Sequence, residues 1–220
     1  MAVLINPGTS PTPVFAYDNL LFFPADCRTC LVAKPARSKH CSLCGRCVQL
    51  FDHHCIWLNN DVGYYTYRYF IGFLVAKIWT FTYGAYLCWT ALGVSPTMFW
   101  TTLRATSTEN KITGTLFLLC VLLLPLVALF LGEHLRYIYL GVTTNETAKW
   151  DYIHYLMQNK LLYKDGSQFL VVDEMGYTTL TGAPINATRP APVTSWDQLT
   201  NIYDHGFVSN LKQRLFPKPL

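Results

Sequence analysis

The feature that most constrains this chain is a block of cysteine and histidine residues between positions 27 and 55. Six of the eight cysteines and three of the six histidines lie in this block. Zn²⁺ takes four thiolate or imidazole ligands in a tetrahedron, and C-x2-C pairs followed by a later Cys/His pair have the spacing to supply them. The block therefore predicts bound zinc. Its first candidate ligands are Cys27, Cys30, His40, Cys41, Cys44 and Cys47.

Disulfide bonds are the competing interpretation of so many cysteines. Disulfides persist in oxidising compartments and are rare in the cytosol. Because the sequence around the block looks cytosol-facing, we expect thiols that bind metal rather than a disulfide framework.

The run Asp52-His53-His54-Cys55 follows the last of these cysteines and joins a carboxylate, two imidazoles and a thiol. A free thiol is mostly protonated at neutral pH, so a nucleophilic cysteine needs a neighbouring base. His53 or His54 can act as that base, and Asp52 can hold one imidazole in the correct tautomer. The competing interpretation makes all four residues metal ligands or solvated turn residues, and spacing alone does not decide between the two.

The composition indicates a membrane protein. Hydrophobic residues make up 51% of the chain and charged residues only 14%, which is unusual for a soluble domain. Residues 69–94 and 112–136 are apolar and long enough to cross a bilayer as helices, and residues 95–111 form the predicted loop between them. Buried core helices of a soluble protein are the alternative, but these stretches are long and lack an amphipathic pattern.

The distribution of basic residues predicts the orientation. Arg68 and the basic metal block flank the first span, and Arg136 and Lys149 flank the second, so the positive-inside rule places both flanks in the cytosol and residues 95–111 in the lumen. Residues 1–26 have no charged leader and no long apolar run, which predicts neither a signal peptide nor a span. A net charge of +4 is too small to indicate a nucleic-acid partner, and the basic residues suit anionic lipid headgroups.

The same residues carry a resemblance to a known family. The spacing C-x2-C-x9-H-C-x2-C-x2-C-x4 before Asp52-His53-His54-Cys55, with the run Lys34-Pro35-x-Arg37-Ser38-x-His40-Cys41, resembles the cysteine-rich domain of the DHHC-type protein S-acyltransferases, or palmitoyltransferases. Together with the apolar stretches, the resemblance predicts a mainly α membrane protein. It would have at least two transmembrane helices and a small irregular two-zinc domain, residues 27–68, on the cytosolic face.

The resemblance implies a ping-pong acyl transfer. Cys55 would take a palmitoyl-type group from acyl-CoA as a thioester and pass it to a cysteine thiol of a protein substrate. His53 would be the general base and Asp52 the residue that orients it, while His54 would turn away to ligate zinc. Exchange between a thioester and a thiol is nearly isoenergetic, so it mainly requires a thiolate and proximity.

The resemblance also implies two interleaved zinc sites. The first would be Cys27, Cys30, His40 and Cys47. The second would be Cys41, Cys44, His54 and a cysteine six residues after the nucleophile, where this sequence has Asp61. A carboxylate can ligate zinc at a similar distance, so we expect Asp61 as the fourth ligand. Water, or Cys55 itself, is the alternative, and ligation by Cys55 would argue against catalysis.

Residues 137–220 form the predicted cytosolic C-terminal region, with two further family motifs. Thr143-Thr144-Asn145-Glu146 matches the Thr-Thr-x-Glu motif, in which a threonine hydroxyl would hydrogen-bond Asp52. Without the resemblance, this run predicts a loop with a helix N-cap at Thr144. Near the end of the chain, Asn210 would help to dock the tail onto the core. Asp165-Gly166 between two apolar runs predicts a β-hairpin.

The sequence thus predicts a membrane-bound protein S-palmitoyltransferase with two structural Zn²⁺ ions and palmitoyl-CoA as acyl donor. Its partners would be membrane lipid and cysteine-containing proteins, without nucleic acid, and its location would be the endoplasmic reticulum or Golgi. Family members usually carry two spans ahead of the cysteine-rich domain, and we expect none in residues 1–26, so the chain is either a truncated gene product or the C-terminal part of a longer protein. The alternative function is therefore a membrane-tethered zinc module that binds a partner and transfers no acyl group.

Overall fold

The computed structural model describes residues 3–9, 12–105, 108–173, 176–182, 185 and 187–219. The chain forms two compact units, one from residues 1–68 and 137–220 and the other from residues 69–136. The parts of the predicted segments that fall on other residues, including positions 106 and 107 of the predicted loop, lie outside the described residues.

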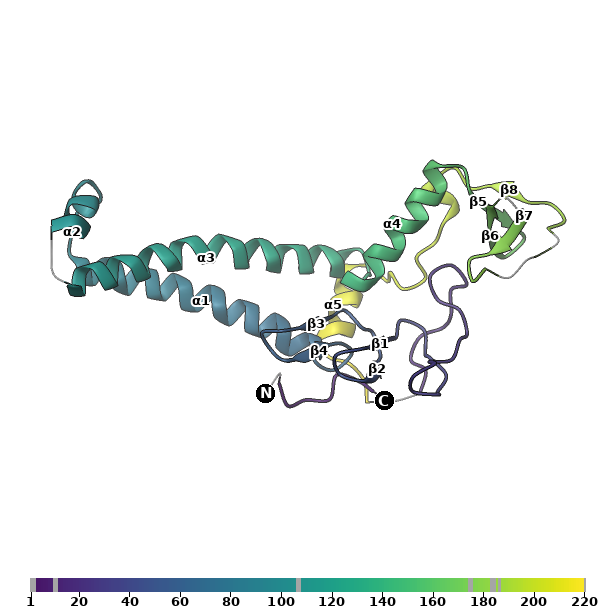
Figure 1. The fold of residues 1–220 in the computed structure, drawn as a ribbon, viewed down its shortest axis with the longest axis horizontal. Helices are drawn as coiled ribbons and strands as arrows, with labels where there is room; N and C mark the ends of the chain where they lie inside the picture. The colour runs from purple at the N-terminus through teal and green to yellow at the C-terminus, as the bar shows by residue number, and fades with distance from the viewer. Residues whose placement is uncertain are drawn as a thin grey trace. The chain divides into compact units, whose positions relative to one another are not determined.

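The cysteine-rich segment contains two short antiparallel hairpins (Figure 1). Strand β1 (Lys39–Cys41) pairs with β2 (Arg46–Val48), and β3 (His53–Cys55) pairs with β4 (Asn60–Val62). Each turn contains a residue in the left-handed region, Gly45 at φ +64° and Asn59 at φ +45°. Most of the segment outside these four short strands has no regular structure, and the hairpins are a feature that the sequence did not predict. Strands of three residues are too short to leave a periodic apolar pattern in the sequence.

The rest of this unit is helix α4 (Thr144–Gln158), a four-stranded sheet and helix α5 (Phe207–Leu215). The sheet has the order β7-β6-β5-β8, with β5 (Leu162–Asp165), β6 (Gln168–Asp173), β7 (Gly176–Thr179) and β8 (Ala191–Pro192). The pairing of β5 with β6 confirms the predicted hairpin. A short 3-10 helix, η2 (Trp196–Gln198), follows the sheet.

The core of this unit joins the N-terminal segment to the C-terminal region. Side chains from residues 20–22 pack against α4 and the start of the sheet. The buried members are Leu20, Leu21, Phe22, Ala36, Ile153, Leu156, Met157, Leu162, Val193 and Tyr203.

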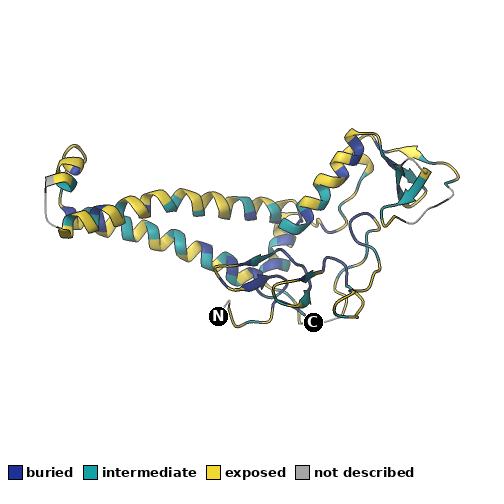
Figure 2. Cartoon of the chain, in the orientation of Figure 1, coloured by how far each residue is buried: buried dark blue, intermediate teal, exposed yellow. Residues whose placement is uncertain are grey.

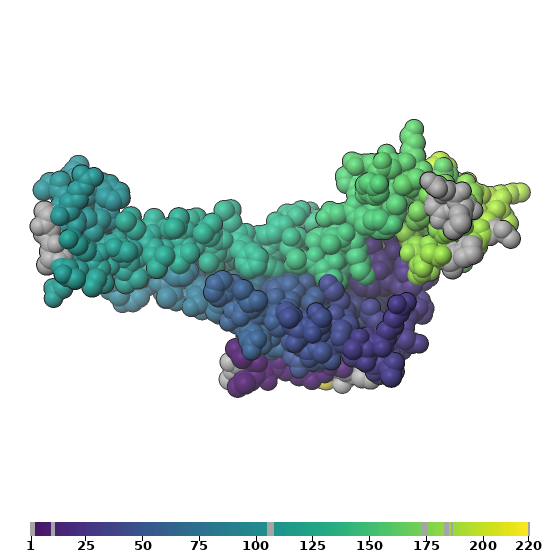
Figure 3. Space-filling model, viewed as in Figure 1, coloured from purple at the N-terminus to yellow at the C-terminus, as the bar shows by residue number. Residues whose placement is uncertain are grey.

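The N-terminal residues cover one side of the hairpins (Figure 3). The side-chain amide of Asn60 donates to the backbone oxygen of Ile5, at 3.0 Å, and that of Gln49 donates to the backbone oxygen of Thr12, at 2.6 Å. The backbone of Gln49 also donates to Gly8. Backbone oxygens of the N-terminal segment therefore accept hydrogen bonds from the cysteine-rich segment, which holds the two segments together.

The second unit contains most of the apolar sequence. Helix α1 (Tyr67–Leu92) is followed by η1 (Pro96–Met98), α2 (Phe99–Ala105) and α3 (Thr108–Tyr139), which runs through Pro125. The segment predicted as a loop, residues 95–111, is thus largely helical. Its 3-10 turn starts at Pro96, a residue that favours the first position of a helix.

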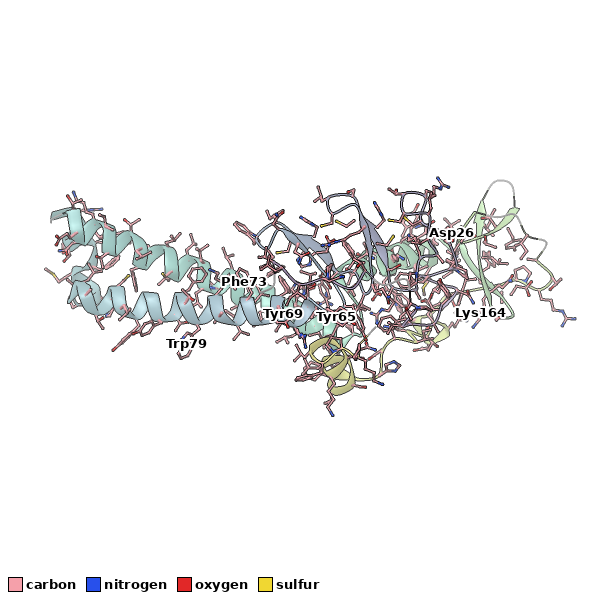
Figure 4. All side chains as sticks on the ribbon, turned by 90° about the horizontal axis from the view of Figure 1, so that it is seen from below. Asp26, Tyr65, Tyr69, Phe73, Trp79 and Lys164 are labelled. Atoms are coloured by element: carbon pink, nitrogen blue, oxygen red, sulfur yellow. The ribbon has the colours of Figure 1, made fainter. Side chains whose placement is uncertain are left out.

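Within the described residues, α1 and α3 are long and apolar enough to cross a membrane, and only 11% of each apolar window is buried. They lie side by side (Figure 1), with Trp89 of α1 against Phe117 of α3 and Gly84 against Cys120. Most of their remaining surface is exposed (Figure 2), and Trp79 projects from α1 away from α3 (Figure 4). Such apolar surface is suited to lipid.

A buried ion pair ties the cysteine-rich segment to α4. The guanidinium of Arg37 donates to both carboxylate oxygens of Glu146, at 2.6 and 2.5 Å, and to the backbone oxygen of Gly141, at 2.9 Å. It also lies over the rings of Phe15 and Tyr203. Both charged side chains are 1% exposed, so each depends on the other for compensation of its charge.

We predict that Arg37→Met destabilises the protein by about 3–5 kcal/mol, because it leaves the Glu146 carboxylate buried without a cation. The measurement is denaturant titration of the detergent-solubilised protein, followed by tryptophan fluorescence. Arg136→Ala is the matched control, since its ion pair with Glu133 is exposed and should cost less than about 1 kcal/mol. Equal losses in the two variants would contradict the prediction.

Candidate active site and metal centres

The first group of metal-ligating side chains is built on the β1–β2 hairpin. His40 and Cys47 are directly opposite each other across the two strands, and Cys27 and Cys30 approach from the preceding turn. The three sulfurs of Cys27, Cys30 and Cys47 lie 3.6, 3.2 and 3.8 Å from Nδ1 of His40. All four ligand atoms lie within 4.8 Å of one another.

The second group repeats this construction on the β3–β4 hairpin. His54 and Asp61 are opposite each other across the strands, and Cys41 and Cys44 come from the turn of the first hairpin. Nδ1 of His54 lies 3.8 and 3.4 Å from the two sulfurs and 2.9 Å from Oδ1 of Asp61. The structure therefore brings Asp61, rather than Cys55, into the set of four.

The donor chemistry of these groups fits a bound cation. One imidazole nitrogen can donate at most one proton, yet in each group it faces three acceptors. Asp61 is fully buried and its Oδ2 has no hydrogen-bond partner among the described residues, while Nε of Arg46 lies 3.9 Å away. Thiolate, imidazole and carboxylate ligands converging on one point are the set that Zn²⁺ takes. Both groups could therefore bind zinc.

Without a cation, Cys44 and Cys47 would stay protonated at neutral pH. Burial raises the pKa of Cys44 to about 12, and its hydrogen bond to Asp61 and the negative charge there add to this effect. Burial and the neighbouring thiols Cys27 and Cys30 raise the pKa of Cys47 to about 12 as well. Only a cation at the centre would let several of these groups be ionised together.

Two of the candidate catalytic residues, His53 and Cys55, lie on β3 on either side of the metal-ligating His54, and Asp52 directly precedes the strand. Successive side chains of a strand point to opposite faces, so His53 and Cys55 share one face and His54 occupies the other. Although the three residues are consecutive, strand geometry thus directs the His53 imidazole and the Cys55 thiol away from the metal-ligating group that contains His54. Cys55 is buried and is a free thiol, like the other seven cysteines.

Asp52 holds His53 in a defined orientation. Its Oδ2 lies 2.8 Å from Nδ1 of His53, and it also accepts the hydroxyl of Thr144 at 2.7 Å and the backbone N–H of Thr144 at 3.1 Å. With these donors, the buried carboxylate acts as an acceptor toward His53 and places the imidazole proton on Nδ1. In this tautomer Nε2 carries the lone pair and is the ring nitrogen that can accept a proton from a thiol.

The Thr-Thr-x-Glu run positions this contact by capping helix α4. The N-cap is Thr143 and not Thr144: its side chain accepts the N–H of Glu146, and the Glu146 side chain accepts the N–H of Thr143. Because Thr143 satisfies the helix end, Thr144 is left to donate to Asp52. The same Glu146 pairs with Arg37, so cap and ion pair share one carboxylate.

Asn210 lies on α5 and holds the tail rather than the reactive strand. Its amide donates to the backbone oxygen of Ile138 at 3.0 Å and to Asp204 at 2.8 Å, and its side-chain oxygen accepts the N–H of His205. It is 2% exposed. A fully bonded, buried asparagine of this kind fixes where α5 docks.

Sequence reasoning assigned no role to Arg37 or Arg214, which are buried arginines of this unit. Arg214 donates to the backbone oxygen of Val142 at 2.8 Å and lies over the ring of Tyr67. Arg37 stood inside the run that carries the family resemblance, which was the available signal. No local pattern marks Arg214, because its partners are far away in the sequence.

We predict that Asp61→Leu lowers the zinc content of the purified protein by about one equivalent, since three ligands hold zinc more weakly than four. Asp61→Cys, which supplies a thiolate at the same cross-strand position, should restore it. The measurement is zinc per protein by mass spectrometry after gel filtration. Asp151→Leu, an exposed carboxylate on α4, is the control, and a full zinc content in Asp61→Leu would contradict the assignment.

Comparison with known proteins gives a family and several relatives. Residues 23–151 match the family model described as DHHC palmitoyltransferase. The chain is 41% identical to Palmitoyltransferase SWF1 of Debaryomyces hansenii, over all of this chain and 67% of the relative. It is 37% identical to the SWF1 proteins of Yarrowia lipolytica and Schizosaccharomyces pombe, each over 92% of this chain and over 61% and 56% of the relative.

The chain thus spans between about half and two thirds of the length of these relatives. The matched region contains both metal-ligating groups, the Asp-His-His-Cys run, both apolar helices and the Thr-Thr-x-Glu run. The expected family resemblance is confirmed. This chain belongs to the DHHC palmitoyltransferase family, a family of membrane proteins.

Proposed function

We propose that this protein is a protein S-palmitoyltransferase in which Cys55 carries the acyl group. The observation that supports this most directly is the Asp52–His53 contact of 2.8 Å beside a buried free thiol on the same strand face. A purely structural zinc module has no need of an oriented imidazole next to a thiol. Family membership and relatives named as palmitoyltransferases support the same activity.

The chemistry needs two transfers. In the first, His53 takes the proton of the Cys55 thiol, and the sulfur attacks the thioester carbonyl of palmitoyl-CoA. The C–S bond to CoA breaks, CoA leaves as the thiol with that proton, and acyl-Cys55 remains. In the second, the thiol of a substrate cysteine attacks acyl-Cys55, the acyl group moves to the substrate and the Cys55 thiol is regenerated.

The residues around Cys55 would act by positioning. Asp52, held by Thr144, keeps His53 in the tautomer that accepts a proton. Two Zn²⁺ ions, one in each group of ligands, would cross-link the hairpins and play a structural role. Because His54 is a cross-strand partner of Asp61, a metal there would also fix the strand that bears Cys55.

The setting would be a membrane of the endoplasmic reticulum or Golgi, with the chain crossing it more than once. Helices α1 and α3 are the two candidate spans, and the basic residues on their flanks support a cytosolic position for the cysteine-rich segment. Acyl-CoA and cysteine-containing proteins would be the substrates, and lipid would surround the apolar helices.

We predict that the detergent-purified protein becomes labelled by radioactive palmitoyl-CoA and that neutral hydroxylamine releases the label, as expected for a thioester. Cys55→Ser should carry no label, because a serine hydroxyl is a far weaker nucleophile than a thiol. Cys88→Ser, in α1, is the matched control and should label like the parent. A parent protein with full zinc but no label would support the binding-module alternative instead.

We predict that Thr144→Val lowers the rate of acyl-enzyme formation about tenfold, since a hydrogen bond to a charged group contributes roughly 1.5–3 kcal/mol. The variant should keep its zinc content, which separates an effect on His53 from misfolding. Thr147→Val is the control, because that hydroxyl donates only to the backbone oxygen of Thr144. An unchanged rate in Thr144→Val would show that the backbone contact to Asp52 is sufficient.

A further inference from the structure

The cysteine-rich segment contains the same turn three times, at a constant spacing. Each turn is closed by an antiparallel pair of residues, and successive pairs are offset by 14 residues. The three pairs are Asp26 with Ala33, His40 with Cys47, and His54 with Asp61.

The interiors of the three turns also correspond. In each, a cysteine follows the first member of the pair, and a residue with positive φ stands four positions after that cysteine. The cysteines are Cys27, Cys41 and Cys55, and the residues with positive φ are Leu31 at +55°, Gly45 at +64° and Asn59 at +45°.

The third turn differs in a backbone hydrogen bond and in one residue type. The N–H of Leu31 donates to Cys27 and that of Gly45 donates to Cys41, whereas the N–H of Asn59 donates to Ile56. Three residues after the first cysteine, the first two turns have a second cysteine, Cys30 and Cys44, and both lie in the metal-ligating groups. The third turn has Leu58, which is 6% exposed. In the first turn the N–H of Cys30 points to the sulfur of Cys27 at 3.4 Å, whereas in the third the N–H of Leu58 donates to the backbone oxygen of Cys55 at 3.1 Å.

The third turn also lacks the cross-strand pair of ligands that a following turn would have to supply. Each of the first two C-x2-C turns shares its metal group with the cross-strand pair of the following turn, so Cys27 and Cys30 join His40 and Cys47. A third group would need ligands another 14 residues on, at positions 68 and 75. These are Arg68 and Val75, both in α1, and neither is a metal ligand.

We infer that Cys55 occupies a turn of the metal-binding type that lacks the second thiol, and that Leu58, at the position of that thiol, is a specificity-determining residue that prevents chelation of a soft cation by Cys55. This inference rests on the proposed role of Cys55 as nucleophile. Two thiols at C-x2-C spacing chelate a soft cation, whereas one thiol beside an apolar side chain holds it weakly. A metal-bound Cys55 sulfur would have its lone pairs engaged and would not attack a thioester.

The test compares the full chain, Leu58→Cys and Ile56→Cys, all kept reduced by a phosphine. Ile56→Cys adds the same number of thiols at the wrong spacing, on an exposed residue outside the metal groups. Each protein is dialysed to equilibrium against Cd²⁺, because a site with two thiols holds a cation more weakly than a four-ligand group and would lose it on a column; the free ions in the dialysate are subtracted. The sum of zinc and cadmium per protein is then counted by mass spectrometry, and thiolate-to-cadmium absorbance is recorded. We expect about one additional metal equivalent in Leu58→Cys only.

Acylation by labelled palmitoyl-CoA is measured on the same samples. We expect Leu58→Cys with Cd²⁺ to label no more than Cys55→Ser does, and a chelator to restore its labelling. Two results would overturn the inference. One is that Leu58→Cys binds no additional metal. The other is a loss of labelling that only more reductant reverses, because that result indicates a disulfide between Cys55 and the introduced thiol. A parent protein that does not label would defeat the proposed function, while the metal count would still decide this inference.

Discussion

The pairing of His54 with Asp61 across β3 and β4 is the contact on which the reactive strand depends. Three-residue strands bury too little apolar surface to be stable, so these hairpins need a further cross-link. The two groups of metal-ligating side chains could provide it with a bound cation, and each is assembled in the same way from a turn and a cross-strand pair. Because directly opposed residues share a face of a hairpin, the register alone places His54 and Asp61 together.

The same register frees the neighbouring residues for chemistry. Alternation along β3 directs His54 toward the metal group and His53 and Cys55 to the opposite face. In a helix, three consecutive side chains would point in three different directions, and His53 and Cys55 would not share a face opposite His54. On a strand, the order His-His-Cys thus places one histidine toward the metal-ligating group and the other histidine on the same face as the cysteine.

A second layer holds this strand against the C-terminal region. Thr143 caps α4 and Thr144 reaches Asp52, while Glu146 closes the capping box and pairs with Arg37. One helix N-terminus therefore contacts both the residue that orients His53 and the buried arginine of the cysteine-rich segment. Any displacement of α4 would disturb the Asp52–His53 contact and the ion pair together, which explains why a four-residue run far from the cysteines belongs to the site.

The sequence by itself determined the family, the residues that could ligate a metal and the two apolar helices, because such residues leave dense local signals in type and spacing. The division of the ligands into two groups came from the family resemblance and not from their spacing. Only the tertiary structure decided that Asp61 joins His54, that Thr144 rather than Thr143 reaches Asp52, and that Arg37 neutralises Glu146. The first contact depends on strand register, the second on which threonine caps α4, and the third on two residues that are about a hundred positions apart in the chain. The helical segment after α1 was missed for a related reason: its short helices are set by packing rather than by a periodic pattern. The 14-residue recurrence of the turn became recognisable only once backbone pairing and φ angles showed that Leu58 stands where the other turns have a ligand.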